Sequence, residues 1–120
     1  GEGMATYYLT FYPPTSVNKM YAPRYRGGMR LTDEAKIWKQ YAALKAAEQW
    51  RGNSPLMGRI CITYRFFAMK HDWDNPCKIL GDAMNKIVYH DDSQIVQAHI
   101  YLYREEKTNP RVDVEVQTLE

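Results

Sequence analysis

Hydrophobic and polar residues alternate with a period of about two in several segments of the chain. Residues 60–66 and 112–116 alternate strictly, with a branched or aromatic residue at every second position. In 94–103 apolar residues alternate with polar residues and tyrosines, and 6–12 is rich in aromatic and β-branched residues. These patterns predict four strands, and the strand over 60–66 is expected to bury one face.

Apolar residues recur at helical spacing after Thr32. Thr32 is a favourable N-cap, and Asp33 and Glu34 follow it in the first turn, where negative charge is stabilising. The predicted helix runs to about Trp50 and is ended by the turn residues 52–55. The residues expected to form its apolar face are Ile37, Tyr41, Leu44, Ala47 and Trp50.

A second helix is predicted at the end of an acidic segment. Asn75 is a good N-cap, and Pro76 suits the first helical position because its missing N–H has no partner to lose there. An apolar stripe at helical spacing predicts a helix from Pro76 to about Tyr89 that docks on the core. The stripe consists of Ile79, Leu80, Ala83, Met84, Ile87 and Val88.

The predicted elements follow one another in the order β-α-β-α-β-β. This order predicts an α+β fold in which a single mixed sheet carries two packed helices. The 120 residues are expected to form one domain, 1–120, that buries roughly two thirds of its unfolded surface. The opening Gly1-Glu2-Gly3 is interpreted as a cloning remnant and is left out of the fold prediction.

Several classes of protein are disfavoured by what the sequence lacks. It has no apolar run that approaches the length of a signal peptide or a membrane span, so we expect a cytoplasmic protein without a membrane partner. Cys61 and Cys77 have neither CxxC spacing nor a matching histidine pattern. They are expected to be structural thiols and not zinc ligands or a disulfide.

The net charge of +2 is unevenly distributed along the chain. Residues 13–51 contain eight basic and three acidic side chains, and the rest of the chain has an acidic excess. Many of the basic residues lie in a predicted loop over 13–31, where Tyr21 and Tyr25 are interleaved with them. Such a loop can contact phosphates through Arg and Lys and stack on bases through tyrosine. A solvated loop without a ligand is the alternative, and charge alone does not decide between them.

Carboxylates cluster on both sides of the second predicted helix. Asp72 and Asp74 are two residues apart, a spacing that points both side chains to one side of an extended segment. Lys78 would lie in the first turn, where the helix N-terminus already favours a phosphate. The pair Asp91-Asp92 opens the next strand, which could bring one of the two back to the cluster. Clustered carboxylates suit Mg²⁺ or Mn²⁺ better than zinc.

The same residues also have an ordinary interpretation. The segment from Asp72 to Pro76 can be a turn and a helix cap, Asp82 can pair with Lys78 four residues earlier, and Asp91-Asp92 can be a solvated loop. Spacing alone leaves both interpretations open.

Three short motifs together resemble the signature of the RusA-type Holliday junction resolvases. They are Asp72-x-Asp74-Asn75-x-x-Lys78, Asp82-Ala83 and Asp91-Asp92-Ser93-Gln94-Ile95, and Pro13-Pro14 with Asn18 and Tyr21 adds to the match. The resemblance extends from about residue 8 to residue 116. It implies a small homodimeric endonuclease of phage or bacterial origin that cleaves four-way DNA junctions with Mg²⁺ or Mn²⁺.

The resemblance also implies roles for individual residues. Asp72, Asp74 and Asp92 would be the metal carboxylates, and Lys78 the essential lysine. The residues that would approach the DNA backbone are Asn18, Lys19, Arg24, Arg26 and Arg30. A two-fold dimer would make paired cuts in a junction that is itself roughly two-fold symmetric, during DNA recombination and repair.

Two alternatives to a resolvase remain at this point. His71-Asp72 and His90-Asp91 resemble the paired His-Asp motifs of other metal-dependent phosphohydrolases, but here both pairs flank strands and not helices. The second alternative is a module that binds branched DNA without cleaving it. In that case the carboxylates would have no catalytic role.

Overall fold

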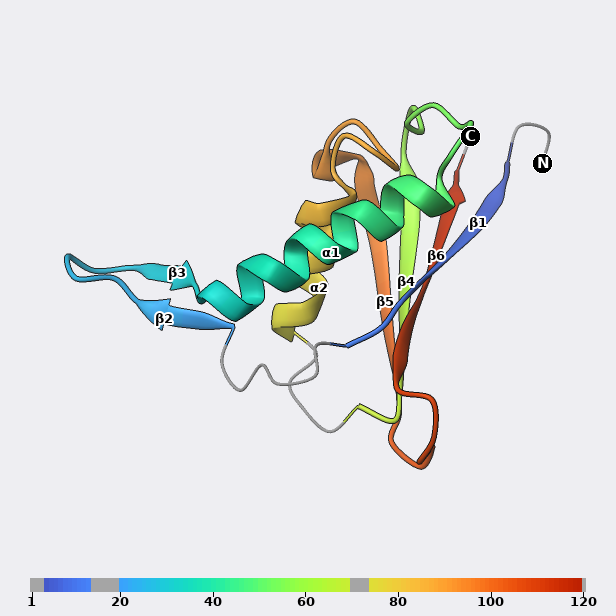
Figure 1. The fold of residues 1–120 in the computed structure, drawn as a ribbon. Coiled ribbons are helices and arrows are strands. Elements are labelled where there is room, and N and C mark those ends of the chain that lie inside the picture. The colour runs from blue at the N-terminus through green and yellow to red at the C-terminus, as the bar shows by residue number, and fades with distance from the viewer. Residues whose placement is uncertain (1–3, 14–19, 70–73, 120) are drawn as a thin grey trace.

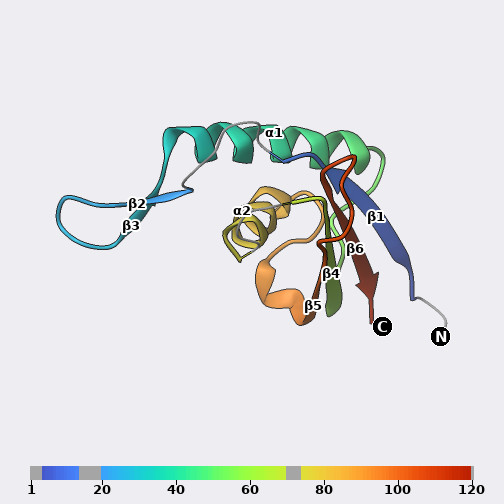
Figure 2. The same cartoon turned by 90° about the horizontal axis from the view of Figure 1, so that it is seen from below.

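The computed structural model describes residues 4–13, 20–69 and 74–119 of the chain. The described residues form a four-stranded sheet, two α-helices and a two-stranded arm. Figure 1 shows the helices packed on the twisted sheet and the arm projecting away from this body. In the view turned by 90°, both helices lie on the same side of the sheet (Figure 2). The predicted α+β architecture is therefore confirmed.

The sheet is mixed and has four strands. Its spatial order is β1 (Thr6–Phe11), β6 (Arg111–Thr118), β4 (Ile60–Phe67) and β5 (Ile95–Tyr103). β4 and β5 are parallel, and the other two pairings are antiparallel. The parallel pair needs a crossover, which a helix between β4 and β5 supplies. The four predicted strands and their order along the chain are confirmed.

The core lies between the sheet and the two helices. Alternate residues of β1, β4 and β6 point into it, as the period of two predicts, and the exposed fraction of Val112, Val114 and Val116 is 0%. The expectation that residues 60–66 bury only one face is wrong, because Cys61 and Thr63 on the other face of β4 are also buried between the neighbouring strands. In contrast, β5 is at the sheet edge and is exposed along nearly all of its length. On the face of the sheet that carries the helices, the apolar surface along β5 is therefore left uncovered.

The first helix, α1 (Asp33–Gln49), has the predicted bounds but buries a different face. Thr32 caps it by accepting a hydrogen bond from the Ala35 backbone. The residues that α1 buries are Ala35, Trp38, Ala42 and Ala46, with Trp50 just past its end. Ile37 and Leu44, expected in the core, are 66% and 69% exposed, and Ala47 is exposed as well. Of the other residues predicted for the apolar face, Tyr41 is partly buried and Trp50 is buried. Alanines on the buried side let the α1 backbone lie close to α2 and β1, a packing that periodicity alone does not reveal.

The second helix, α2 (Asp74–Met84), begins earlier and ends earlier than predicted. Pro76 is its third residue, which is allowed because the first four N–H groups of a helix have no partner within it. Asp74 is therefore helical, so the prediction of an extended pair Asp72/Asp74 is wrong for Asp74. The helix ends before Lys86, which has a positive φ of 72° and turns the chain. No helix in the described part of the chain is long and apolar enough to cross a membrane.

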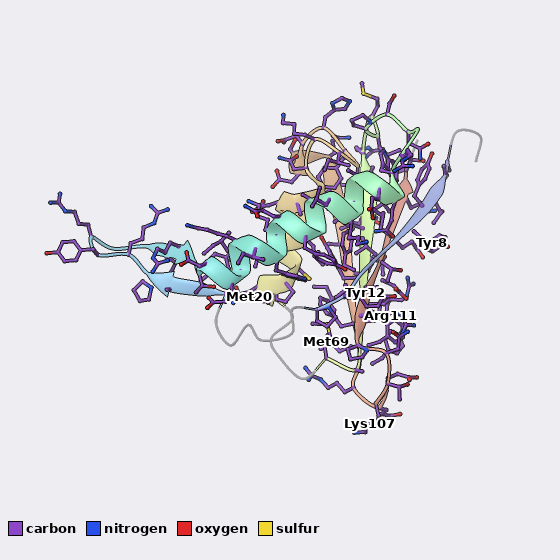
Figure 3. The ribbon with its side chains drawn as sticks, viewed as in Figure 1. Tyr8, Tyr12, Met20, Met69, Lys107 and Arg111 are labelled. Atoms are coloured by element: carbon purple, nitrogen blue, oxygen red, sulfur yellow. The ribbon has the colours of Figure 1, made fainter. Side chains whose placement is uncertain are left out.

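Part of the predicted basic loop forms an antiparallel arm, made of β2 (Tyr21–Pro23) and β3 (Met29–Leu31). Its tip turns through Gly27 and Gly28, both at positive φ, where glycine costs least. Figure 3 shows Met20 where the arm joins the body and Tyr8 on β1 at the other end of the molecule. The sequence signal for these strands was weak because each has only three residues.

The two cysteines are both free and lie in different elements, as expected for structural thiols. Cys61 is buried in β4, and Cys77 is half-buried in α2.

Candidate active site

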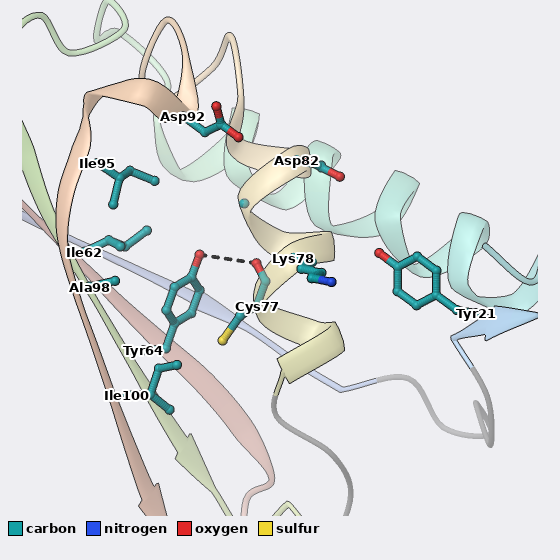
Figure 4. Close-up of a pocket in the computed structure, with 11 residues that line it drawn as sticks. Tyr21, Ile62, Tyr64, Cys77, Lys78, Asp82, Asp92, Ile95, Ala98 and Ile100 are labelled. Carbon is teal, nitrogen blue, oxygen red and sulfur yellow. Dashed lines mark hydrogen bonds between the residues drawn. The ribbon is translucent and has the colours of Figure 1, made fainter. Parts of the chain in front are cut away.

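A pocket of about 400 Å³ opens between α2, the parallel strands β4 and β5, and the base of the arm (Figure 4). Its floor is apolar, with Ile62 on β4 and Ile100 on β5. Its charged residues are Lys78 and Asp82 from α2 and Asp92 from the turn before β5. The edge position of β5 leaves this floor open, so a ligand can reach both the apolar surface and the three charges.

Lys78 extends from α2 toward the base of the arm (Figure 4). Its Nζ lies 6.0 Å from the centroid of the Tyr21 ring, within the range of a cation–π contact. Because α2 begins at Asp74, Lys78 is the fifth helical residue and lies just past the first turn, not within it as predicted. Lys78 still comes directly after the first four residues of α2, whose backbone N–H groups have no partner within the helix. An anion is favoured at this end of the helix.

Asp82 is one turn after Lys78 on the same side of α2 and lines the same pocket. The ordinary interpretation of this pair predicted an ion pair across one turn of helix. Among the described residues, the structure contains no Lys78–Asp82 ion pair. The lysine and the carboxylate are therefore both available to a ligand in the pocket.

The adjacent residues Asp91 and Asp92 have different surroundings. They lie at a short 3₁₀ turn, η1 (Asp92–Gln94), and not at the start of a strand as predicted. Asp91 is the N-cap of this turn, and its Oδ2 accepts a hydrogen bond from the Ser93 backbone at 3.0 Å. Hydrogen bonds from the Ser93 side chain and backbone lower the pKa of Asp91. Asp92, by contrast, lines the pocket (Figure 4).

Gln94 fixes this turn to the body of the protein. Its Oε1 accepts hydrogen bonds from the backbones of His90 and Asp91, at 2.8 and 2.9 Å. Its Nε2 donates to the carbonyls of Leu56 and Gly58, which precede β4, at 2.8 and 2.9 Å. Gln94 thereby positions Asp92 without touching the pocket. Sequence analysis did not give Gln94 this role, although the spacing Asp91-x-x-Gln94 is that of a capping box.

Two buried tyrosines donate hydrogen bonds to backbone carbonyls of α2, Tyr64 from β4 and Tyr89 from the segment that follows the helix. The Tyr89 hydroxyl donates to the Gly81 carbonyl at 2.7 Å, and the Tyr64 hydroxyl donates to the Cys77 carbonyl at 3.5 Å. Burial raises the pKa of both hydroxyls well above the ordinary value, so they remain protonated donors. Both acceptors belong to the stretch of α2 that carries Lys78 and Asp82, whose positions depend on these contacts.

Comparison with protein families gives one match that covers most of the chain. The family model described as endodeoxyribonuclease RusA matches residues 11–117. The chain belongs to the RusA family. Membership of this family implies endodeoxyribonuclease activity on Holliday junctions, which makes the protein a DNA hydrolase. The comparison with curated proteins gave no significant match.

The structure of this RusA-family chain places only some of the predicted site residues in the pocket. Lys78 and Asp92 line it, and Asp74 is exposed at the start of α2. Burial, together with the carboxylates of Asp82 and Asp74, raises the pKa of Tyr21, so both carboxylates lie near the base of the arm. Asp82 and Tyr21 are pocket residues that sequence analysis did not assign to the site.

The remaining predicted residues lie on the arm or outside the described ranges. Arg24, Arg26 and Arg30 are exposed on the arm and do not line the pocket. The predicted residues that fall outside the described part of the chain are Asp72, Asn18, Lys19 and His71.

The carboxylates of the RusA-family site suit a hard divalent cation in their chemistry. Oxygen ligands of this kind are those that Mg²⁺ and Mn²⁺ prefer. Within residues 4–13, 20–69 and 74–119, no three His, Cys, Asp or Glu side chains are grouped closely enough to hold a metal ion. The described residues by themselves therefore form no metal site, and Asp72, one of the predicted ligands, lies outside them.

Proposed function

We propose that this RusA-family chain resolves four-way DNA junctions by Mg²⁺-dependent hydrolysis of the phosphodiester backbone, with Mn²⁺ as a substitute, in DNA recombination and repair. The observation that carries the proposal is the open pocket in which Asp92, Asp82 and Lys78 meet, in a chain whose family match spans residues 11–117. The pocket thus presents Asp92, a carboxylate of the proposed metal site, and Lys78, a cation able to bind a phosphate, within one opening.

The residues proposed to hold the metal are Asp72, Asp74 and Asp92. Asp92 lines the pocket, and Asp74 lies at the N-terminal end of the helix that forms its wall. When bound, Mg²⁺ would supply a water of lowered pKa and neutralise charge on the phosphate oxygens. The Asp74 and Asp92 carboxylates are exposed, so using these two as ligands needs no burial of a charge.

Lys78 is proposed to bind a non-bridging oxygen of the scissile phosphate. Its ammonium is exposed toward the pocket, beside the helix N-terminus of α2, and both favour an anion at the same place. Charge on the phosphate oxygens grows during hydrolysis, so a fixed cation there lowers the barrier to the reaction. The Tyr64 and Tyr89 hydrogen bonds to α2 hold this lysine in position.

The basic arm is proposed to bind the DNA backbone beside the pocket. Arg24, Arg26 and Arg30 are exposed there, and Tyr21 at the arm's base lines the pocket itself. Asn18 and Lys19 precede the arm in sequence and belong to the same proposal. Phosphate contacts of this kind set the affinity and the register on the DNA but carry no sequence information. The junction is then recognised by its branched shape.

The proposal is tested with a labelled four-way junction and a linear duplex of the same sequence, each with Mg²⁺ or with EDTA. We expect cuts in the junction only, and only with the metal. Asp74→Asn is expected to lower cleavage by more than about a hundredfold, because loss of even an outer-shell partner of a metal commonly costs ten- to a hundredfold. Junction binding should persist, since the change removes a negative charge near DNA.

The matched control is Asp33→Asn. Asp33 lies in the first turn of α1, as Asp74 does in that of α2, so both changes remove a similar helix-dipole interaction. Asp33→Asn should cleave as the wild type does. Tight junction binding without cleavage in Mg²⁺ or Mn²⁺ would contradict the proposal and favour a binding module.

A homodimer is proposed because two opposed strands of a junction must be cut. Exposed tyrosines on the strands provide a surface for it: Tyr8, Tyr101 and Tyr103 are 71%, 48% and 39% exposed. The register places Tyr8 opposite Glu115 and Tyr101 beside Arg65, on the sheet face that the helices do not cover. Such aromatic side chains are enriched in protein interfaces.

Sedimentation equilibrium at micromolar concentration is expected to give twice the chain mass of 14.1 kDa. With a cruciform plasmid as substrate, paired cuts within one binding event should produce linear DNA without accumulation of the nicked circle. A monomeric mass at all concentrations that support cleavage, or nicked circle as the main product, would exclude the paired-cut dimer.

A further inference from the structure

The tip of the β2–β3 arm carries the most exposed large hydrophobic side chain of the described residues. Tyr25 is 99% exposed, and its neighbours Arg24 and Arg26 are exposed as well. The arm projects from the body in both ribbon views (Figures 1 and 2). An aromatic ring that stays in water does not stabilise the fold, because its stabilising contribution comes from burial. Tyr25 therefore has no evident structural role.

The charge of the arm indicates what kind of ligand would cover this ring. Residues 20–31 contain three arginines and no acidic residue, so the ring lies in a purely basic surrounding. A nucleic acid matches this combination, since it offers phosphates to arginine and base faces to tyrosine. The glycines at 27 and 28 add no side chains beside the tip, so a base can approach it closely.

The base of the arm belongs to the candidate active site. Tyr21 lines the pocket, and its ring centroid is 6.0 Å from Lys78 Nζ (Figure 4). The four residue steps from Tyr21 to Tyr25 span at most about 13 Å when extended. Together with the 6.0 Å between Tyr21 and Lys78, this places the tip within about 20 Å of a phosphate held at Lys78, or about six base-pair steps of duplex.

From this placement we infer that Tyr25 stacks on a base that is unpaired or unstacked at a DNA branch point, with Arg24 and Arg26 on the flanking phosphates. The inference rests on the proposed function and names the element that distinguishes a junction from duplex DNA. In an intact duplex every base face is already stacked, so exposing one costs free energy. At a branch point this cost is smaller, and the stacking contact therefore favours the junction.

The test compares Tyr25→Ala, Tyr25→Phe and the control Leu44→Ala, a change at an exposed residue of α1 that belongs neither to the pocket nor to the proposed dimer surface. Binding to a four-way junction and to a duplex is measured in EDTA, so that the result does not depend on cleavage. Tyr25→Ala is expected to weaken junction binding about tenfold and to leave duplex binding unchanged. Tyr25→Phe, which keeps the ring, and Leu44→Ala should remain within about twofold of the wild type.

A second readout reports on stacking directly. 2-Aminopurine placed at the branch point should lose fluorescence when the wild type or Tyr25→Phe binds, and should lose less with Tyr25→Ala. The inference would be overturned if Tyr25→Ala bound the junction as tightly as the wild type does. It would also be overturned if Tyr25→Ala weakened binding to the junction and to the duplex by the same factor. A change in oligomeric mass in Tyr25→Ala would overturn it as well, because the tip would then contact a second copy. Absence of metal-dependent cleavage by the wild type, with these binding results intact, would overturn the proposed nuclease mechanism alone.

Discussion

Replacing Asp92 by asparagine is expected to reduce junction cleavage by more than about a hundredfold, whereas Asp91→Asn should keep most of the activity. The two residues are adjacent and chemically identical, but only Asp92 lines the pocket with Lys78. The Asp91 carboxylate is already used as the N-cap of the turn before β5. An asparagine can still cap there, because its side-chain oxygen accepts the same backbone hydrogen bond.

Cleavage by Asp91→Asn and Asp92→Asn is measured under single-turnover conditions with Mg²⁺, together with junction binding in EDTA. Both variants should bind the junction at least as tightly as the wild type, since each removes one negative charge. Thermal unfolding provides the control for folding. If only Asp91→Asn lost cleavage, the assignment of Asp92 as a metal ligand would be wrong and Asp91 would take its place.

Leu80→Ala is expected to lower the free energy of unfolding by about 3 kcal/mol, within the usual range of 2–5 kcal/mol for a buried leucine. Leu80 is 0% exposed on the buried side of α2, so its loss leaves a cavity beneath the helix that carries Lys78 and Asp82. Leu44→Ala is the matched control, because Leu44 is also helical but is 69% exposed. Its substitution should change the free energy of unfolding by less than about 0.5 kcal/mol.

The free energy of unfolding of both variants and of the wild type is measured by urea denaturation. Equal m-values would show that the substitutions change stability and not the surface exposed on unfolding. The periodicity of α1 predicted Leu44 in the core, so a loss of several kcal/mol in Leu44→Ala would support the sequence pattern against the structure. Equal stability of Leu80→Ala and the wild type would mean that α2 does not pack as described.

The fold was largely predictable from local patterns. The alternation in 60–66 and 112–116 corresponds to β4 and β6, and Thr32 caps α1 as expected. These patterns are reliable because side-chain direction repeats every two residues in a strand and every 3.6 in a helix. The buried face of α1 was not predictable in this way, since apolar residues occur on both sides and only contact with α2 selects the alanines.

The chemistry of the site was also visible in the sequence, because the residue types of the motifs indicate metal and phosphate binding before any geometry is known. The residue types indicated Asp72, Asp74, Lys78 and one residue of the pair Asp91-Asp92 as candidates, and the resemblance to the RusA family selected Asp92. The family match confirms the resemblance, and the roles of these residues stay predictions. Their arrangement was not visible. The start of α2 at Asp74 moved Lys78 out of the first turn, and it removed the extended geometry assumed for Asp74.

The sequence by itself thus determined the types of element, their order and the set of groups able to do chemistry. Only the tertiary structure decided which of them meet. It turned Asp92 toward the pocket and left Asp91 as a cap, because Gln94 ties the intervening turn to the carbonyls of Leu56 and Gly58, far away in sequence. It also placed Tyr21 of the arm beside Lys78. Contacts between residues distant in sequence depend on how whole elements pack, and local patterns carry no record of that packing.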